Sequence, residues 1–121
     1  MSQRSRTGKR AEFLAAWWLR LKGFAIVARG WTNRRGSGAG EIDIVAKRGN
    51  LLVFVEVKAR ADIDKAAHAL RPAQRNRISR GALAFVAAHP HLERCAMRFD
   101  VILVSPKHWP RHISDAWRMD A

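Results

Sequence analysis

The chain has little cysteine and no long apolar run, and each shortage excludes a class of protein. Cys95 is the only cysteine, so an intramolecular disulfide is excluded and a zinc site built on thiolates is not expected. Glu12, Arg20 and Lys22 interrupt the apolar run after the basic start, so no stretch reaches the roughly 18 apolar residues of a transmembrane helix. We therefore expect a cytoplasmic protein without a membrane partner.

Acidic residues are also scarce. The sequence holds 10 Asp and Glu against 23 Lys and Arg, which gives a formal net charge of +13. Such a surplus attracts polyanions at long range, and the preference for Arg over Lys suits bidentate contacts with phosphate. Nucleic acid is the expected partner, and the alternative is that the charge only reflects an Arg-rich proteome.

The rest of the composition is that of one folded domain. Hydrophobic residues make up 48% of the 121 residues, which is enough for a single packed core. No internal repeat and no linker divides the chain. We expect residues 1–8 to form a basic disordered tail and residues 9–121 to form a single domain.

Hydrophobic patterning predicts the element order helix, three strands, helix, strand. One helix is expected over 9–22 and another over 72–88, where Pro72 suits the first helical position. A short helix at 113–118 is expected to close the chain. The predicted strands are rich in β-branched and aromatic residues and span 24–31, 41–48, 51–58 and 97–104. Three successive strands favour an antiparallel meander, and the last strand is expected to return parallel, giving a mixed α/β sheet flanked by helices.

The first helix is predicted to have two unlike faces. Its large apolar side chains share one face, namely Phe13, Leu14, Trp17, Trp18 and Leu21. We expect this face to be buried in the core or in a homodimer rather than to stack on bases. Glu12 lies on the other side, among Ala15, Ala16 and Leu19. It either faces the sheet and completes a metal site or is a solvated residue favoured by the helix dipole.

The stretch GEIDIVAKRGNLLVFVEVK, residues 40–58, places acidic residues inside apolar strands. Gly49 and Asn50 suit a two-residue hairpin turn. A turn of that length sets Asp43 opposite Glu56, just as it sets Val45 opposite Phe54. The acidic residues would then gather at the end of the hairpin farthest from the turn.

Opposed carboxylates in this hairpin predict a cation site. Their Cβ atoms would lie about 5 Å apart, and two charges that close repel unless a cation or a proton joins them. Mg²⁺ accepts one or two protein carboxylates and keeps positions for water and phosphate. Lys58 points to the same side, where it would position a water or stabilise a phosphate. The alternative is an exposed hairpin with cross-strand salt bridges, such as Glu41 with Lys58.

At these residues the sequence resembles a known family. An acidic residue in one strand followed by Glu-x-Lys in the next resembles the PD-(D/E)xK nuclease signature. The wider stretch GEIDIVAKRGNLLVFVEVKAR is similar to the central block of the YraN family, also called UPF0102, and the resemblance covers roughly residues 8–105. It implies a restriction-endonuclease-like core and a Mg²⁺- or Mn²⁺-dependent endonuclease acting on DNA, including branched or structured DNA. The alternative is a nucleic-acid-binding protein that keeps the fold without cutting.

The resemblance also implies residue roles. Asp43 and Glu56 would be the metal carboxylates, with the Val57 carbonyl as a further ligand. Lys58 would be the catalytic lysine, and Glu12 would be the first-helix acid that supports the metal. The sequence departs from the signature at Ile42, where the signature has proline.

Polar residues of the second helix have less specific expected roles. Gln74 stands where relatives usually carry lysine, and it shares a helical stripe with Ile78 and Phe85. We expect its amide to reach the site, or else to be a simple polar residue of the first turn. Asp100, in the last strand, is expected to pair with an arginine. The arginines expected to contact nucleic-acid phosphates, unless they are merely solvated, are Arg34, Arg35, Arg71, Arg75 and Arg77.

Overall fold

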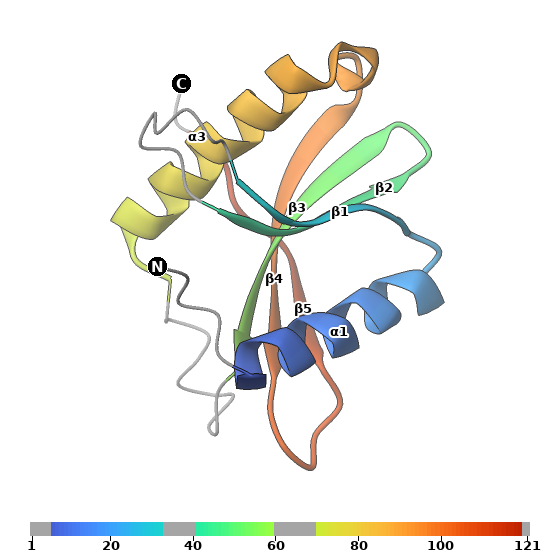
Figure 1. Cartoon of the computed structure of the whole chain (residues 1–121), viewed down its shortest axis with the longest axis vertical. Helices are drawn as coiled ribbons and strands as arrows, with labels where there is room; N and C mark the ends of the chain where they lie inside the picture. The colour runs from blue at the N-terminus through green and yellow to red at the C-terminus, as the bar shows by residue number, and fades with distance from the viewer. Residues whose placement is uncertain (1–5, 33–40, 60–69, 120–121) are drawn as a thin grey trace.

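The computed structural model describes residues 6–32, 41–59 and 70–119, which build a mixed sheet with helices packed on both faces (Figure 1). The helical elements are α1 (Arg6–Leu21), α3 (Pro72–Ala88) and the short 3₁₀ helix η1 (Pro90–Leu92). The strands are β1 (Ala25–Trp31), β2 (Ile42–Arg48), β3 (Leu51–Ala59), β4 (Ala96–Val104) and β5 (Arg111–Trp117).

The sheet has five strands in the order β1-β2-β3-β4-β5. Strands β1, β2 and β3 form an antiparallel meander, and β4 returns parallel to β3 after the helix α3. The predicted mixed α/β arrangement, with its order of helix, three strands, helix and strand, is therefore confirmed. Helix α1 begins at Arg6, so its first residues lie inside the segment that was predicted to be a disordered tail.

Each face of the sheet has its own apolar core. On one face, Ala15 and Leu19 of α1 pack against Ile44 and Val55. On the other face, α3 packs its Phe85 ring edge-on to Phe54, with centroids 5.9 Å apart. Burying a large apolar side chain in this way contributes about 1.5–3 kcal/mol relative to leaving it exposed. The two helices thus hold β2 and β3 in the middle of the molecule.

The expectation that the large face of α1 packs into the core was wrong for four of its five residues, whereas the half-buried Trp18 does pack against the core. Burial of this face in a homodimer stays a prediction. The sheet covers the side that carries Ala11, Glu12, Ala15, Ala16 and Leu19. The opposite side chains are 43–74% exposed, and they are Phe13, Leu14, Trp17 and Leu21. Small residues let a helix backbone approach a sheet closely, so alanine faces inward here although the larger side chains have more apolar area to bury.

The predicted helix over 113–118 was also wrong, because these residues lie in or next to the edge strand β5. Ile113 pairs with Val101 and Trp117 pairs with Phe99, with the register shifting between the two pairs. The Trp117 and Phe99 rings stack with centroids 5.1 Å apart. A few residues make a marginal helix in water, whereas pairing with β4 satisfies the backbone and buries the tryptophan.

A buried carboxylate fixes this edge strand. Asp100 accepts two 2.9 Å hydrogen bonds from Arg98, one of 2.9 Å from the Asp115 backbone N–H, and one of 2.7 Å from His112 Nε2. The expected pairing with an arginine is confirmed, whereas the His112 contact has no signal in the sequence. Burial alone would raise the pKa of Asp100, but hydrogen bonds from His112, Arg98 and Asp115 together lower it below its ordinary value.

Candidate metal and catalytic site

The site begins where the β2–β3 hairpin stops pairing through its backbone. The register runs from Arg48 opposite Leu51 to Ile44 opposite Val55, as the two-residue turn predicts. One step further, the Val57 N–H donates to Asp43 Oδ2 at 2.9 Å. A side-chain carboxylate thus takes the place of a strand carbonyl, which fixes Asp43 over β3.

Glu56 and Lys58 complete the cluster from β3. Lys58 Nζ lies 3.2 Å from Glu56 Oε2, and each side chain is only 15% exposed. Burial raises the pKa of Glu56 to about 8, and the negative charge and hydrogen bond of Asp43 add to this effect while Lys58 opposes it. Burial and the neighbouring charge thus disfavour the ionised form of Glu56. Asp43 and Glu56 interact through their side chains, one residue beyond the last backbone pair of the ladder, Ile44 with Val55.

The chemistry of this cluster fits a hard divalent cation. Asp43 and Glu56 offer carboxylate oxygens, and the Val57 carbonyl is the adjacent backbone oxygen. Within the described residues, no three His, Cys, Asp or Glu side chains gather at one place. Mg²⁺ needs no such cage, because it binds through one or two carboxylates and completes its shell with water and phosphate. A cation between the carboxylates would also offset the burial and the Asp43 charge that raise the pKa of Glu56.

Glu12 is buried at 4% exposure, so the solvated alternative for it was wrong. Its Oε1 lies 3.4 Å from Arg29 Nε. Arg29 is opposite Ile44 in the β1–β2 register, and Ile44 packs in the core beneath α1. The contact described for this carboxylate is thus an ion pair with β1. A role for Glu12 in supporting the metal stays a prediction.

Comparison with known proteins identifies the relationship that the hairpin suggested. A family model described as "Uncharacterised protein family UPF0102" matches residues 11–104. The chain belongs to the UPF0102 family. It is 59% identical to the UPF0102 protein of Paramagnetospirillum magneticum, over 95% of this chain and 89% of that one. It is 50% identical to the UPF0102 protein of Parvibaculum lavamentivorans, over 93% of this chain and 82% of that one.

The span that defines UPF0102 contains the whole cluster of Asp43, Glu56 and Lys58, and it also contains Glu12 and Gln74. It ends at the last residue of β4, so β5 and the Asp100 partners His112 and Asp115 lie beyond it. The family match thus covers every residue to which a catalytic role was assigned.

In this UPF0102 protein the second-helix residue Gln74 has a structural contact. Its side-chain oxygen accepts a 3.0 Å hydrogen bond from the Arg71 backbone N–H, which caps the start of α3. That oxygen is committed to the helix terminus, and a further role of Gln74 at the cluster stays a prediction.

The arginines predicted to bind nucleic acid differ in exposure. Arg71 and Arg77 are exposed on α3, whereas Arg75 is half-buried and its buried Nε donates no hydrogen bond to a described residue. Arg34 and Arg35 lie outside the described residues. None of the helices built by the described residues is long and apolar enough to cross a membrane.

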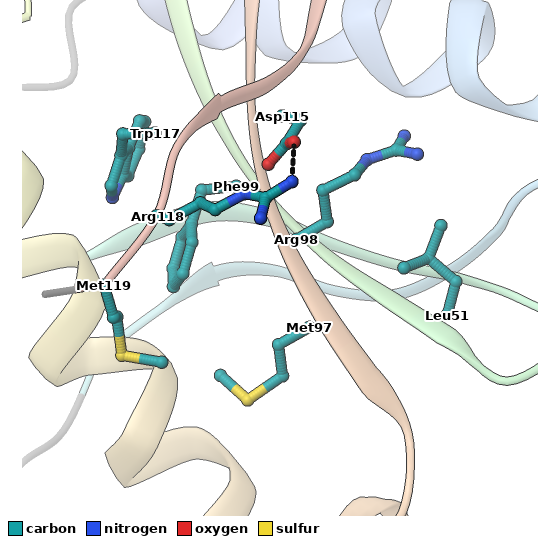
Figure 2. A pocket seen from close by; sticks show the side chains of 8 residues that line it. All are labelled: Leu51, Met97, Arg98, Phe99, Asp115, Trp117, Arg118 and Met119. Atoms are coloured by element: carbon teal, nitrogen blue, oxygen red, sulfur yellow. Dashed lines mark hydrogen bonds and ion pairs between the residues drawn. The ribbon is translucent and has the colours of Figure 1, made fainter. Parts of the chain in front are cut away.

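A cavity of about 420 Å³ lies near the start of β3 and the end of β5, away from the carboxylate cluster (Figure 2). Figure 2 shows the residues that line it. Arg118, next to the edge strand β5, donates a 3.0 Å hydrogen bond to Asp115 of the same strand. Leu51, at the turn end of the hairpin, is part of the wall. None of the residues predicted to be catalytic or metal-binding lines this cavity.

Proposed function

We propose that this UPF0102 protein is a Mg²⁺- or Mn²⁺-dependent endonuclease that hydrolyses phosphodiester bonds in DNA. The observation that carries the proposal is the crowding of Asp43 and Glu56 next to Lys58, where the backbone N–H of Val57 fixes Asp43. Two adjacent half-buried acids, one with its pKa raised by burial and by the charge of the other, form a poor structural pair, but they form a good cation site. The motif of one acid followed by Glu-x-Lys supports placement in the restriction-endonuclease-like superfamily.

The cluster offers the parts that phosphodiester hydrolysis needs. When bound, the divalent ion would polarise a phosphate oxygen and acidify a water. Lys58 carries a positive charge 3.2 Å from Glu56, so its ammonium can hold that water or donate hydrogen bonds to the phosphate. Water loses a proton as its oxygen adds to phosphorus, the bond to the leaving sugar oxygen breaks, and that oxygen takes up a proton from solvent.

Charge and position support DNA as the substrate. The net charge of +13 neutralises phosphates and makes binding depend on salt. Arg71, Arg75 and Arg77 of α3 are proposed to contact the backbone, together with Arg34 and Arg35. Such a substrate also agrees with the cytoplasmic location expected from the sequence.

The proposal is tested by incubating linear, nicked, flap and junction DNA with Mg²⁺, Mn²⁺ or EDTA. Cleavage is expected with either metal and not with EDTA. Asp43→Asn and Lys58→Ala should abolish it, while Glu93→Gln, which changes an exposed acid after η1, should not. Cleavage that survives the first two changes contradicts the site. Salt-dependent binding without cleavage in any metal would support the alternative, a non-catalytic nucleic-acid-binding protein.

A further inference from the structure

Helix α1 presents aromatic side chains to solvent instead of to the core. We use the name aromatic face for Phe13, Leu14, Trp17 and Leu21 together with Trp109 from the β4–β5 connection, which is 80% exposed. The Trp109 ring lies 6.0 Å from the ring of Trp18, so the connection and the helix form one surface. Exposed apolar residues gathered in this way mark an interaction site more often than scattered ones do.

A groove adjoins this face at the carboxyl ends of the parallel strands. It has a volume of about 330 Å³ and lies between α1, β3 and β4, with Ala11 and Leu14 on one wall and Val104 and Pro106 on another. Ala59 also borders it, and Ala59 directly follows the proposed catalytic Lys58. The groove therefore lies beside the aromatic face on the α1 side of the sheet, whereas Glu56 and Lys58 alternate with Phe54 onto the α3 side.

The rim of this surface is basic. Residues 6–22 and 104–113 contain one acid, Glu12, which is buried. The exposed charges around the face are Lys9, Arg10, Arg20, Lys22, Lys107 and Arg111. Arg20 lies over the Trp17 ring at 5.5 Å from its centroid. A second copy of the chain would bring like charges together, so the occupant that fits carries negative charge.

We propose that the aromatic face binds a single-stranded segment of nucleic acid. Exposed rings bordered by arginine and lysine are what unpaired bases stack on, while the rim contacts the phosphates. Trp17, Phe13 and Trp109 supply the rings, and the groove beside Leu14 extends this surface. That this single strand is an arm of the DNA being cut rests on the proposed function. The binding of single-stranded nucleic acid to the aromatic face does not rest on it. This inference is an alternative to burial of the α1 aromatics in a homodimer, which stays a prediction.

The test measures fluorescence anisotropy of a labelled oligothymidylate and of a blunt duplex, in EDTA, with Asp43→Asn as the background. Trp17→Ala and Trp109→Ala should each weaken single-strand binding about tenfold and change duplex binding little. Trp17→Phe should restore most of the affinity because it keeps a ring. Leu83→Ala removes a side chain that is 53% exposed on α3, and it should have no effect.

Equal losses on both DNA forms, or no loss on the single strand, would overturn the proposal. So would binding to phosphatidylserine vesicles that Trp17→Ala abolishes while single-strand binding stays intact. Metal-dependent cleavage combined with Trp17-independent single-strand binding removes only this inference. Trp17-dependent binding without any cleavage removes only the proposed activity.

Discussion

Two carboxylate clusters lie in the same sheet and show opposite electrostatics. Asp100 of β4 is fully buried and accepts hydrogen bonds from Arg98, His112 and a backbone N–H, and its pKa is lowered. Glu56 of β3 is partly buried beside a second acid, Asp43, and its pKa is raised to about 8. The first carboxylate is stabilised as an anion by the fold. The second is destabilised as an anion, although Lys58 lies 3.2 Å away.

The difference separates a structural acid from a candidate catalytic acid. A buried carboxylate that serves only the fold needs donors for its oxygens, and Asp100 has them from two strands. The pKa of Glu56 is instead raised by burial and by the charge of Asp43, and two carboxylates placed in this way suit a divalent ion. Perturbed pKa values of this kind gather at functional sites, and here the perturbation coincides with the end of the β2–β3 ladder.

The largest expected effect concerns the stability that Asp100 provides. Asp100→Ala should reduce the free energy of unfolding by about 3–5 kcal/mol, because Arg98 and the buried His112 lose their common partner. Urea denaturation measures this loss. Arg118→Ala, which removes only the exposed partner of Asp115, should change the free energy of unfolding far less. Equal losses for the two variants would mean that the buried Asp100 contributes no more to stability than an exposed ion pair.

Asp43→Asn should have the reverse profile. Cleavage should fall by about 100-fold or more, because the cation loses a charged ligand, while the free energy of unfolding stays the same or increases as the repulsion with Glu56 is removed. Parallel activity assays and urea denaturation separate the two effects. A large loss of stability in this variant would mean that Asp43, like Asp100, mainly serves the fold.

The pH dependence of stability should also differ in sign between the clusters. Because the folded-state pKa of Glu56 is raised from 4.5 to about 8, its contribution is complete below pH 4.5 and is lost as the pH rises through about 8. Because the pKa of Asp100 is lowered, its contribution is present above the ordinary 3.8 and is lost as the pH falls. Urea denaturation from pH 3 to pH 9 measures both the alkaline loss of stability from Glu56 and the acidic loss from Asp100.

Glu56→Gln should flatten the alkaline side of that profile without changing the acidic side. Mg²⁺ should restore the wild-type stability above neutral pH by binding the ionised pair. A wild-type profile that does not respond to Mg²⁺ would contradict cation binding at this cluster.

The smallest expected effect on stability concerns a third buried acid, Glu12, which is paired with an arginine as Asp100 is. Arg29→Ala should cost about 1 kcal/mol, because the Arg29 side chain is 38% exposed and its 3.4 Å contact is partly solvated. If Glu12 serves the fold alone, the concentration of Mg²⁺ that supports half-maximal cleavage should be the same for Arg29→Ala as for the wild type. A shift in that concentration would group Glu12 with Asp43 and Glu56.

The hairpin is the part of the fold and site that sequence reasoning predicted best. Alternation along two strands and a two-residue turn determine which residues oppose each other, and all of these relations are local. The same reasoning failed for α1, since amphipathic spacing does not tell whether alanines or tryptophans face a sheet. It also failed for β5, where Ile113 and Trp117 have helical spacing but pair with β4.

Sequence by itself determined the net charge, the register of β2 with β3 and therefore the gathering of Asp43, Glu56 and Lys58. Only the tertiary structure decided the environment of each charge. Lys22 and His112 meet at 2.9 Å although 90 positions separate them, and His112 in turn holds Asp100. Such contacts depend on how α1, β4 and β5 pack, and local patterns carry no information about that packing. The exposed aromatic face of α1 follows from the same packing.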